Sequence, residues 1–264
     1  MTKAHELYLK KLTRYKNFIK ITRILVFVVF LSLWEVAARL DWIDEFFFSS
    51  PGKIAAWYMK SIISGELFLH IGYTLLETIL SFLLVMLLTI LIASVLWFSK
   101  PLADIFEPSL VILNSLPKSA LAPLFIVWLG TGTKTIIIAG ISVAVFGSVI
   151  SLFTQFKQTD EDRRKLILTL GGNNLDVYRK IVLPYSVPTL INSTKVNIGL
   201  SLVGVIIGEF LAARRGLGYL IIYGTQVFKL DMVISAIIIL CFIAYGLYFL
   251  IQILENHIPF MNEE

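Results

Sequence analysis

Long apolar runs separated by short polar stretches dominate the sequence. A helical run needs about 17 residues or more to cross the hydrocarbon core of a bilayer. The pattern predicts six such spans, at residues 24–40, 73–98, 110–129, 136–156, 189–211 and 232–254. We therefore predict an all-α integral membrane protein with about six transmembrane helices.

The composition agrees with this fold class. Hydrophobic residues make up 57% of the 264 residues and charged residues only 16%, whereas soluble domains carry about 25% charged residues. The single cysteine, Cys241, lies in an apolar run, so neither a disulfide framework nor a Cys/His metal cluster is expected. The basic residues behind the net charge of +5 gather at the ends of the spans without interleaved aromatic residues. This pattern favours orientation in a bilayer over nucleic-acid binding.

Charge bias also predicts how the chain is oriented. Residues 1–23 hold seven lysines and arginines against one acidic residue, so the positive-inside rule places the N-terminus in the cytoplasm. We expect these residues to form a cytoplasmic basic segment, either as a solvated tail or as an amphipathic helix on the membrane surface. Residues 24–264 are expected to form the transmembrane domain, with an acidic segment outside the membrane at 41–70 and a short cytoplasmic C-terminal tail.

Two features of the spans predict contacts between or along helices. Glu35 and Arg39 lie four residues apart near the outer end of the first span, where they can pair on one face, with a substrate contact as the alternative. The fourth span carries small residues that favour close helix packing. These are Gly140, Ser142, Ala144, Gly147 and Ser148.

The third span is predicted to be broken by Pro117 and Pro123. Polar groups at membrane depth require protein burial or a water-filled cavity, so this span is expected to line a translocation path. Lys118 suits an anionic substrate, or else it pairs with a carboxylate or with helix carbonyls. The residues assigned to the path, two of them from the fifth span, are Asn114, Ser115, Pro117, Lys118, Asn197 and Glu209.

Residues 159–188 form the longest strongly charged interruption between apolar runs. The local signals predict a short helix, a glycine corner and a second helix. In chain order they are Thr159 as an N-cap, Gly171 and Gly172 as the left-handed corner, Asn173 or Asn174 as the second cap, and Pro184 as the stop of the second helix. A further glycine turn follows Arg214 and Arg215, whose expected partner is Glu209.

Gly171, Ile181, Leu183 and Pro184 fit the G-x9-I-x-L-P half of the EAA loop. The chain therefore resembles the membrane subunits, or permeases, of binding-protein-dependent ABC importers. In that family the loop, here about residues 157–187, forms coupling helices that dock in a groove of a cytoplasmic ATPase. Lys165 departs from the pattern, because the family usually has Glu there. The resemblance implies coupling roles for Lys165, Gly171, Gly172, Tyr178, Ile181, Leu183 and Pro184.

Residues 113–132 and 207–221 resemble the branch that serves nitrate, sulfonate, taurine, bicarbonate and vitamin-precursor importers. This likeness implies that Gly216, Leu217 and Gly218 lead into a short outer helix at an external gate. It also implies a substrate that is a small anion or a vitamin precursor such as a pyrimidine or flavin.

The resemblance implies a multi-pass permease of a bacterial inner or plasma membrane, with both termini cytoplasmic. Its partners would be two ABC ATPase subunits that carry ATP and Mg, a second permease copy, an extracytoplasmic binding protein and membrane lipid. The sequence has no G-x-x-x-x-G-K-[ST] loop and no recognisable catalytic or metal-binding constellation, so no enzyme and no cofactor in this chain are expected. Two alternatives stay open: an ion-coupled secondary transporter or channel, and a membrane anchor without a path.

Overall fold

The computed structural model describes residues 3–256, with side chains for residues 12–255. The described chain is helical, and no strand occurs within it. In chain order the helices are α1 (Lys3–Arg39), α2 (Glu45–Phe48), α3 (Pro51–Ile63), α4 (Glu66–Phe98), α5 (Lys100–Ser115), α6 (Lys118–Leu129), α7 (Thr133–Lys157), α8 (Glu161–Thr169), α9 (Asn174–Val177), the π-helical η1 (Tyr178–Val182), α10 (Leu183–Ala212), α11 (Leu217–Gln226) and α12 (Leu230–Asn256).

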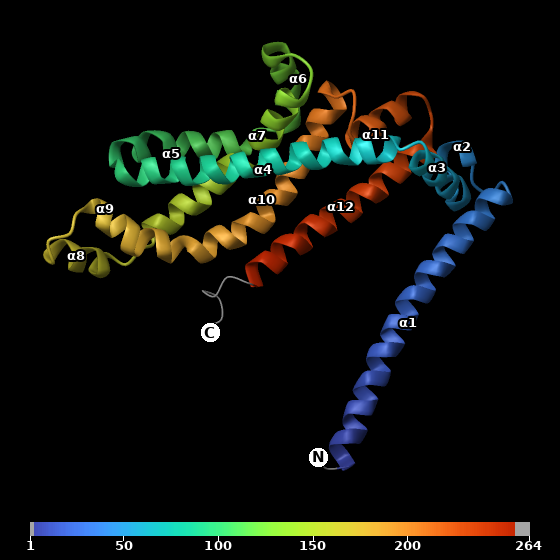
Figure 1. Ribbon diagram of the computed structural model, residues 1–264, viewed down its shortest axis with the longest axis horizontal. Helices are drawn as coiled ribbons and strands as arrows, with labels where there is room; N and C mark the ends of the chain where they lie inside the picture. Colours follow the sequence, from blue (N-terminus) through green and yellow to red (C-terminus); the bar gives the residue numbers. More distant parts are fainter. Residues whose placement is uncertain (1–2, 257–264) are drawn as a thin grey trace.

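Five helical segments within the described chain are long and apolar enough to cross a membrane, and α5 with α6 can form a sixth span that is bent by 100°. The predicted all-α fold with about six spans is therefore confirmed. In Figure 1, α8 and α9 lie at one end of the long axis, while α2, α3 and α11 lie at the opposite end. We refer to these as the inner and the outer end, following the sequence prediction.

The centre of the bundle is α7, which packs against both α4 and α10. Glycines allow the closest approach, because a Cβ atom on Gly204 would lie 2.7 Å from the Gly140 Cα and 2.8 Å from the Ala139 carbonyl oxygen. A Cβ on Gly208 would likewise lie 2.9 Å from the Ile136 Cα. The predicted close packing of the fourth span is thus confirmed at Gly140.

Helix α1 stands apart from this bundle (Figure 1). Only 6% of its most apolar stretch is buried, so this helix faces lipid or another protein rather than its own core. It is continuous across residue 23, without a break between the basic segment and the apolar run. The predicted pairing is confirmed: Arg39 Nε lies 2.8 Å from Glu35 Oε1, and the Gly52 amide donates to Glu35 Oε2 at 2.9 Å. Glu35 therefore holds α1 to α3.

Helices α2 and α3 form a small outer cap that packs on α12. Ser50 caps α3, with Pro51 in its first turn. Lys53 lies 2.6 Å from Glu45 and, by its hydrogen bond, lowers the pKa of the Glu45 carboxyl. The Tyr58 hydroxyl donates to the Ser235 carbonyl of α12 at 2.8 Å, while burial raises the Tyr58 pKa.

The contact between α7 and α10 yields a test with a matched control on the same helix. Gly204→Ala is expected to lower the free energy of unfolding by about 1–3 kcal/mol, because the added methyl group meets backbone atoms that cannot rotate away. Gly199→Ala places a methyl group with nothing within 4 Å and should leave stability unchanged. Thermal unfolding of the purified protein in detergent compares the two. Equal unfolding midpoints for both variants would contradict the close approach.

Candidate functional site

The segment between α7 and α10 folds into an exposed corner, made of α8, a glycine turn and α9, at the inner end of the bundle (Figure 1). Gly171 has φ +85°, as the predicted left-handed corner requires. The Gly172 amide donates to the Ile167 carbonyl at 3.0 Å, and the Gly171 amide donates to the Leu168 carbonyl at 3.1 Å. Gly172 is needed for space, because a Cβ there would lie 2.6 Å from the Ile167 side chain.

The helix caps confirm one prediction and correct another. Asn173 caps α9 in a reciprocal capping box with Asp176, as expected. The N-cap of α8 is Asp160, whose side chain accepts from the Asp162 amide at 2.9 Å. Thr159, the predicted cap, is buried, and its hydroxyl has no hydrogen-bond partner in the described structure. The prediction failed because two adjacent residues both suit this position, and the tertiary burial of Thr159 leaves it to Asp160.

The prediction that Pro184 ends the second helix is also wrong. Residues Asn174–Ala212 form one continuous helical segment of 39 residues. A π-helical turn, η1, precedes the proline, and the Leu183 amide donates to the Tyr178 carbonyl five residues earlier. The wider turn shifts the hydrogen-bond ladder just where Pro184 supplies no amide, so the helix passes through it.

The surface of the corner mixes charges with exposed leucines. Leu170 is 78% exposed and Leu166 is 59% exposed, and Leu168 and Leu175 are also open to solvent. The exposed ammonium of Lys165 pairs loosely within α8, at 3.8 Å from Glu161 and 3.7 Å from Asp162. An exposed apolar patch bordered by charges is typical of a surface that binds another protein.

The base of the corner is fastened to the bundle by Tyr178. Its ring packs against Trp97, Phe98 and Phe156, with centroids 5.0 to 5.8 Å away. Its hydroxyl lies 2.6 Å from the Ser94 hydroxyl of α4. Of the other predicted coupling residues, Ile181 and Leu183 are half-buried near this base and Pro184 is exposed. The corner is therefore attached to the ends of α4 and α7.

The third span breaks between α5 and α6, which confirms the predicted break at Pro117. The predicted break at Pro123 is wrong, because α6 continues through this proline. The Lys118 ammonium donates to the carbonyls of Leu113, Asn114 and Leu116, the last two at 2.9 and 3.0 Å. Of the two predicted roles for Lys118, the structure thus shows the pairing with helix carbonyls. Asn114, Ser115 and Pro117 lie exposed on the single chain, whereas Lys118 is partly covered.

The two path candidates in the fifth span are buried within the chain. Asn197 accepts from the Ser148 hydroxyl at 2.5 Å and lies near Met86, so it joins α10 to α7 and α4. Glu209 has no exposed surface and accepts from the Thr74 hydroxyl at 2.7 Å and from the Gly218 amide at 2.5 Å. Both side chains make contacts between elements of one chain.

Residues 213–218, which we call the outer loop, are held tightly by this second network. Thr74 also accepts from the Leu217 amide at 2.8 Å, and the Gly216 amide donates to His70 Nδ1 at 3.0 Å. Gly216 has φ +114°, and a Cβ on it would collide with the Glu209 carboxylate. The predicted gate residues, Gly216, Leu217 and Gly218, are buried at the start of the short helix α11.

The expected pairing of Glu209 with the two arginines is wrong. The Arg215 guanidinium instead donates to the Tyr73 hydroxyl at 2.9 Å and lies over the Tyr73 ring. The Glu209 carboxylate points into the protein instead, because it accepts hydrogen bonds from the Gly218 amide and the Thr74 hydroxyl. Sequence reasoning missed Thr74 and His70, since neither has a local pattern that predicts a partner more than 130 residues away.

Comparison with known proteins gives a family match. The profile described as binding-protein-dependent transport system inner membrane component matches residues 86–258, more than half of the chain. A probable ABC transporter permease protein of Haemophilus influenzae is 28% identical over 87% of this chain and 93% of its own. A putative aliphatic sulfonates transport permease of Bacillus subtilis is 27% identical over 80% of this chain and 76% of its own. A formylaminopyrimidine transport permease of Halalkalibacterium halodurans is 25% identical over 74% of this chain and 77% of its own.

Solved structures show the same fold. An inward-facing conformation of the MetNI methionine ABC transporter superposes with a TM-score of 0.62, covering 73% of this chain and 95% of that chain at 17% sequence identity. The likeness to the branch that includes sulfonate permeases, predicted from residues 113–132 and 207–221, agrees with the relatives found.

The outer loop network provides a second test. Thr74→Val keeps the shape of the side chain but leaves the Leu217 amide and the Glu209 carboxylate without their shared partner, at a cost of about 1–3 kcal/mol. Thr78 lies one turn further along α4, is equally buried, and its hydroxyl has no partner in the described structure. Thr78→Val should therefore leave stability unchanged. Thermal unfolding and protease cleavage near residues 213–216 measure both variants, and equal behaviour would rule out the network.

Proposed function

Because the chain belongs to the binding-protein-dependent transport system inner membrane component family, we propose that it is the permease subunit of an ATP-driven importer whose ATPase docks on the corner of α8 and α9. The exposure of Leu166 and Leu170 on this corner carries the proposal. Leucines in water at the end of a membrane bundle have no internal partner, and a protein groove would cover them. The family is that of a transporter's membrane component, not of an enzyme.

The corner also suits the transmission of motion. Tyr178 joins it to α4 and α7, and its second helix continues into α10 without a break. A push on α9 would therefore be transferred along a stiff helix rather than absorbed in a loop. Lys165 stands where the family usually has Glu, and its exposed ammonium would meet an acidic or carbonyl-rich part of the ATPase groove.

The remaining partners follow from this role. Two ATPase subunits would bind ATP with Mg²⁺, an extracytoplasmic binding protein would deliver the substrate, and a second copy of this chain would complete the path. The exposed side chains of Asn114 and Ser115 beside the break of the third span would face that second copy. Family membership favours this function over an ion-coupled transporter or an anchor.

For the substrate we propose a small organic anion. The sulfonate relative supports this class, and Arg214 and Arg215 place positive charge at the outer end. The formylaminopyrimidine relative supports the alternative, a vitamin precursor. We place the basic N-terminal part of α1 and the C-terminus in the cytoplasm of a bacterial cell, on the same side as the corner.

Coupling is tested by two glycines of matched geometry. Gly171 and Gly65 both have positive φ and open space around the missing Cβ, but they lie at opposite ends of the molecule. Valine in a left-handed conformation costs roughly 1–2 kcal/mol at either site. In proteoliposomes with the partner ATPase and binding protein, Gly171→Val should lower substrate-stimulated ATP hydrolysis about tenfold, a usual size of coupling between linked sites. Gly65→Val should leave hydrolysis near the wild-type rate. Equal rates for the two variants would contradict the proposal.

Orientation is tested by labelling single cysteines. With Cys241 replaced by Ala, Lys60→Cys in α3 should react with a membrane-impermeant maleimide added to intact spheroplasts. Lys165→Cys in α8 should react only after the membrane is permeabilised. Both side chains are exposed, so access through the membrane alone decides the result. Reaction of Lys165→Cys in intact spheroplasts would place the corner outside, where no ATPase could reach it.

A further inference from the structure

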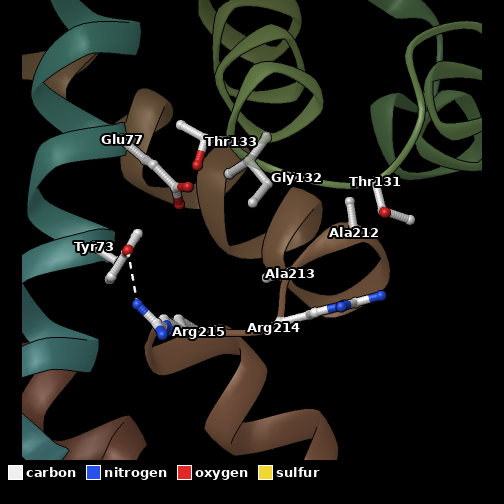
Figure 2. Close-up of a pocket in the computed structure, with 10 residues that line it drawn as sticks. Tyr73, Glu77, Thr131, Gly132, Thr133, Ala212, Ala213, Arg214 and Arg215 are labelled. Carbon is white, nitrogen blue, oxygen red and sulfur yellow. Dashed lines mark hydrogen bonds between the residues drawn. The ribbon is translucent and has the colours of Figure 1, made fainter.

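Two glutamates, Glu77 of α4 and Glu209 of α10, meet in the interior near the outer end of the bundle. Glu77 is only 1% exposed, and Glu209 has no exposed surface. The Glu209 carboxyl group lies within hydrogen-bonding reach of Glu77, and so does the Thr133 hydroxyl at the start of α7. Figure 2 shows Glu77 beside Thr133, at the edge of a cavity of about 430 Å³ next to the outer loop. The two acidic groups therefore lie side by side away from water.

Neither carboxyl group has a positively charged partner. No ion pair within the part of the chain that the structure describes includes Glu77 or Glu209. The Arg215 guanidinium donates to the Tyr73 hydroxyl and lies over that ring, and Figure 2 shows Arg214 directed away from Glu77. Two neighbouring buried carboxyl groups without a cation cannot both be ionised, so one of them keeps its proton.

The hydrogen bonds indicate which of the two glutamates carries the proton. Glu209 accepts from the Thr74 hydroxyl at 2.7 Å and from the Gly218 amide at 2.5 Å, and two such donors stabilise a charged carboxylate. Glu77 Oε2, in contrast, has no hydrogen-bond partner in the described structure. A proton on Glu77 supplies a donor toward Glu209. The buried oxygen then gains a partner, and a single negative charge remains.

The outer loop lies directly against this pair. A Cβ atom on Gly216 would collide with the Glu209 carboxylate, and a Cβ on Gly218 would lie 2.8 Å from Glu209 Oε2. Glu77 and Glu209 themselves belong to long helices that both pack against α7. A second negative charge on Glu77 would therefore be relieved by movement of the outer loop, which lets water reach the two carboxylates, rather than by separation of the helices.

We propose that Glu77 and Glu209 share one proton that keeps the outer loop closed, and that loss of this proton at alkaline pH opens the loop. Because opening releases a proton, the closed loop is favoured at low pH and is lost as the pH rises. This device needs neither a substrate nor an ATPase, so it goes beyond the proposed transport function. It would make access to the outer end of the protein depend on pH.

Other titratable groups around the outer loop would respond differently to pH. His70 Nδ1 accepts from the Gly216 amide at 3.0 Å, so protonation of this histidine would loosen the loop at acidic rather than alkaline pH. The other charged or titratable side chains around the loop in the described chain are Glu66, Tyr73, Lys134, Arg214 and Arg215. Exposed carboxylates stay ionised above neutral pH, and tyrosine, lysine and arginine side chains lose their protons only above about pH 9.

Infrared spectroscopy of the full chain in lipid nanodiscs detects the shared proton directly. The wild-type protein should show the C=O stretching band of a buried carboxylic acid at about pH 7 and lose it by about pH 9, the range in which buried carboxylic acids ionise. Glu77→Gln should lack this band, because its amide donates to Glu209 in place of the acid. Asp104→Asn removes an exposed carboxyl group from α5 and should keep the band.

Trypsin cleavage after Arg214 or Arg215 measures opening of the outer loop in the same nanodiscs. Cleavage after the exposed Arg163 of α8 is the internal standard, because it reports how pH changes the protease itself. The ratio of outer-loop cleavage to α8 cleavage should rise about tenfold from about pH 7 to about pH 9 in the wild-type protein, since loss of one proton changes an equilibrium by up to about tenfold per pH unit. In Glu77→Gln the ratio should stay constant, because no second charge forms.

Three results would overturn the shared proton. A constant cleavage ratio in the wild-type protein would do so even if Glu77→Gln fails to fold. A pH response that persists unchanged in Glu77→Gln would assign the response to another group. A cleavage ratio that follows the sodium concentration instead of pH would show a metal cation between the two carboxylates. None of these results depends on the ATPase coupling that is tested with Gly171.

Discussion

The contact of α10 with α7 is the constraint on which the rest of the structure depends. Inside a bilayer, lipid tails are as apolar as leucine, so helices associate through close packing and hydrogen bonds rather than through the hydrophobic effect. Gly204 and Gly208, which lie about one helical turn apart, bring the backbone of α10 against that of α7. Larger side chains at these contact positions would push the two helices apart. The elements attached to both ends of α10 would then be displaced.

Helix α10 carries a different functional element at each end. At its inner end η1 and α9 lead into the exposed corner, and at its outer end Glu209 holds the outer loop. Because residues Asn174–Ala212 are one helical segment, these two ends cannot move independently without bending or tilting the helix. The π-helical turn before Pro184 is what makes this continuity compatible with a proline. In the proposed importer, this helix would link ATPase docking inside to substrate entry outside.

Local signals in the sequence predicted part of this arrangement well. The apolar runs predicted the spans, Gly171 and Asn173 predicted the corner, and the spacing of Glu35 and Arg39 predicted their pair, since each depends on residues close in the chain. The prediction that Pro184 ends the helix was wrong because a π-helical turn offset the usual effect of proline. No residue pattern predicts such a turn. The partners of Glu209 could not be deduced, because they lie far away in the chain. The roles predicted for Lys118 included the observed one, but tertiary folding decided between them.

The polar contacts of the α9–α10 segment argue that the moving unit of the protein is larger than one helix. At three levels the segment is tied to its neighbours: Tyr178 to Ser94 of α4, Asn197 to Ser148 of α7, and Glu209 to Thr74 of α4. With the glycine contacts between them, α4, α7 and α10 have little freedom to slide past one another. A change between inward- and outward-facing states would then occur between this three-helix unit and another body. Within the described chain, α1 and α12 bury little of their apolar stretches, so in the proposed importer a second permease copy would be the other body that fits this requirement.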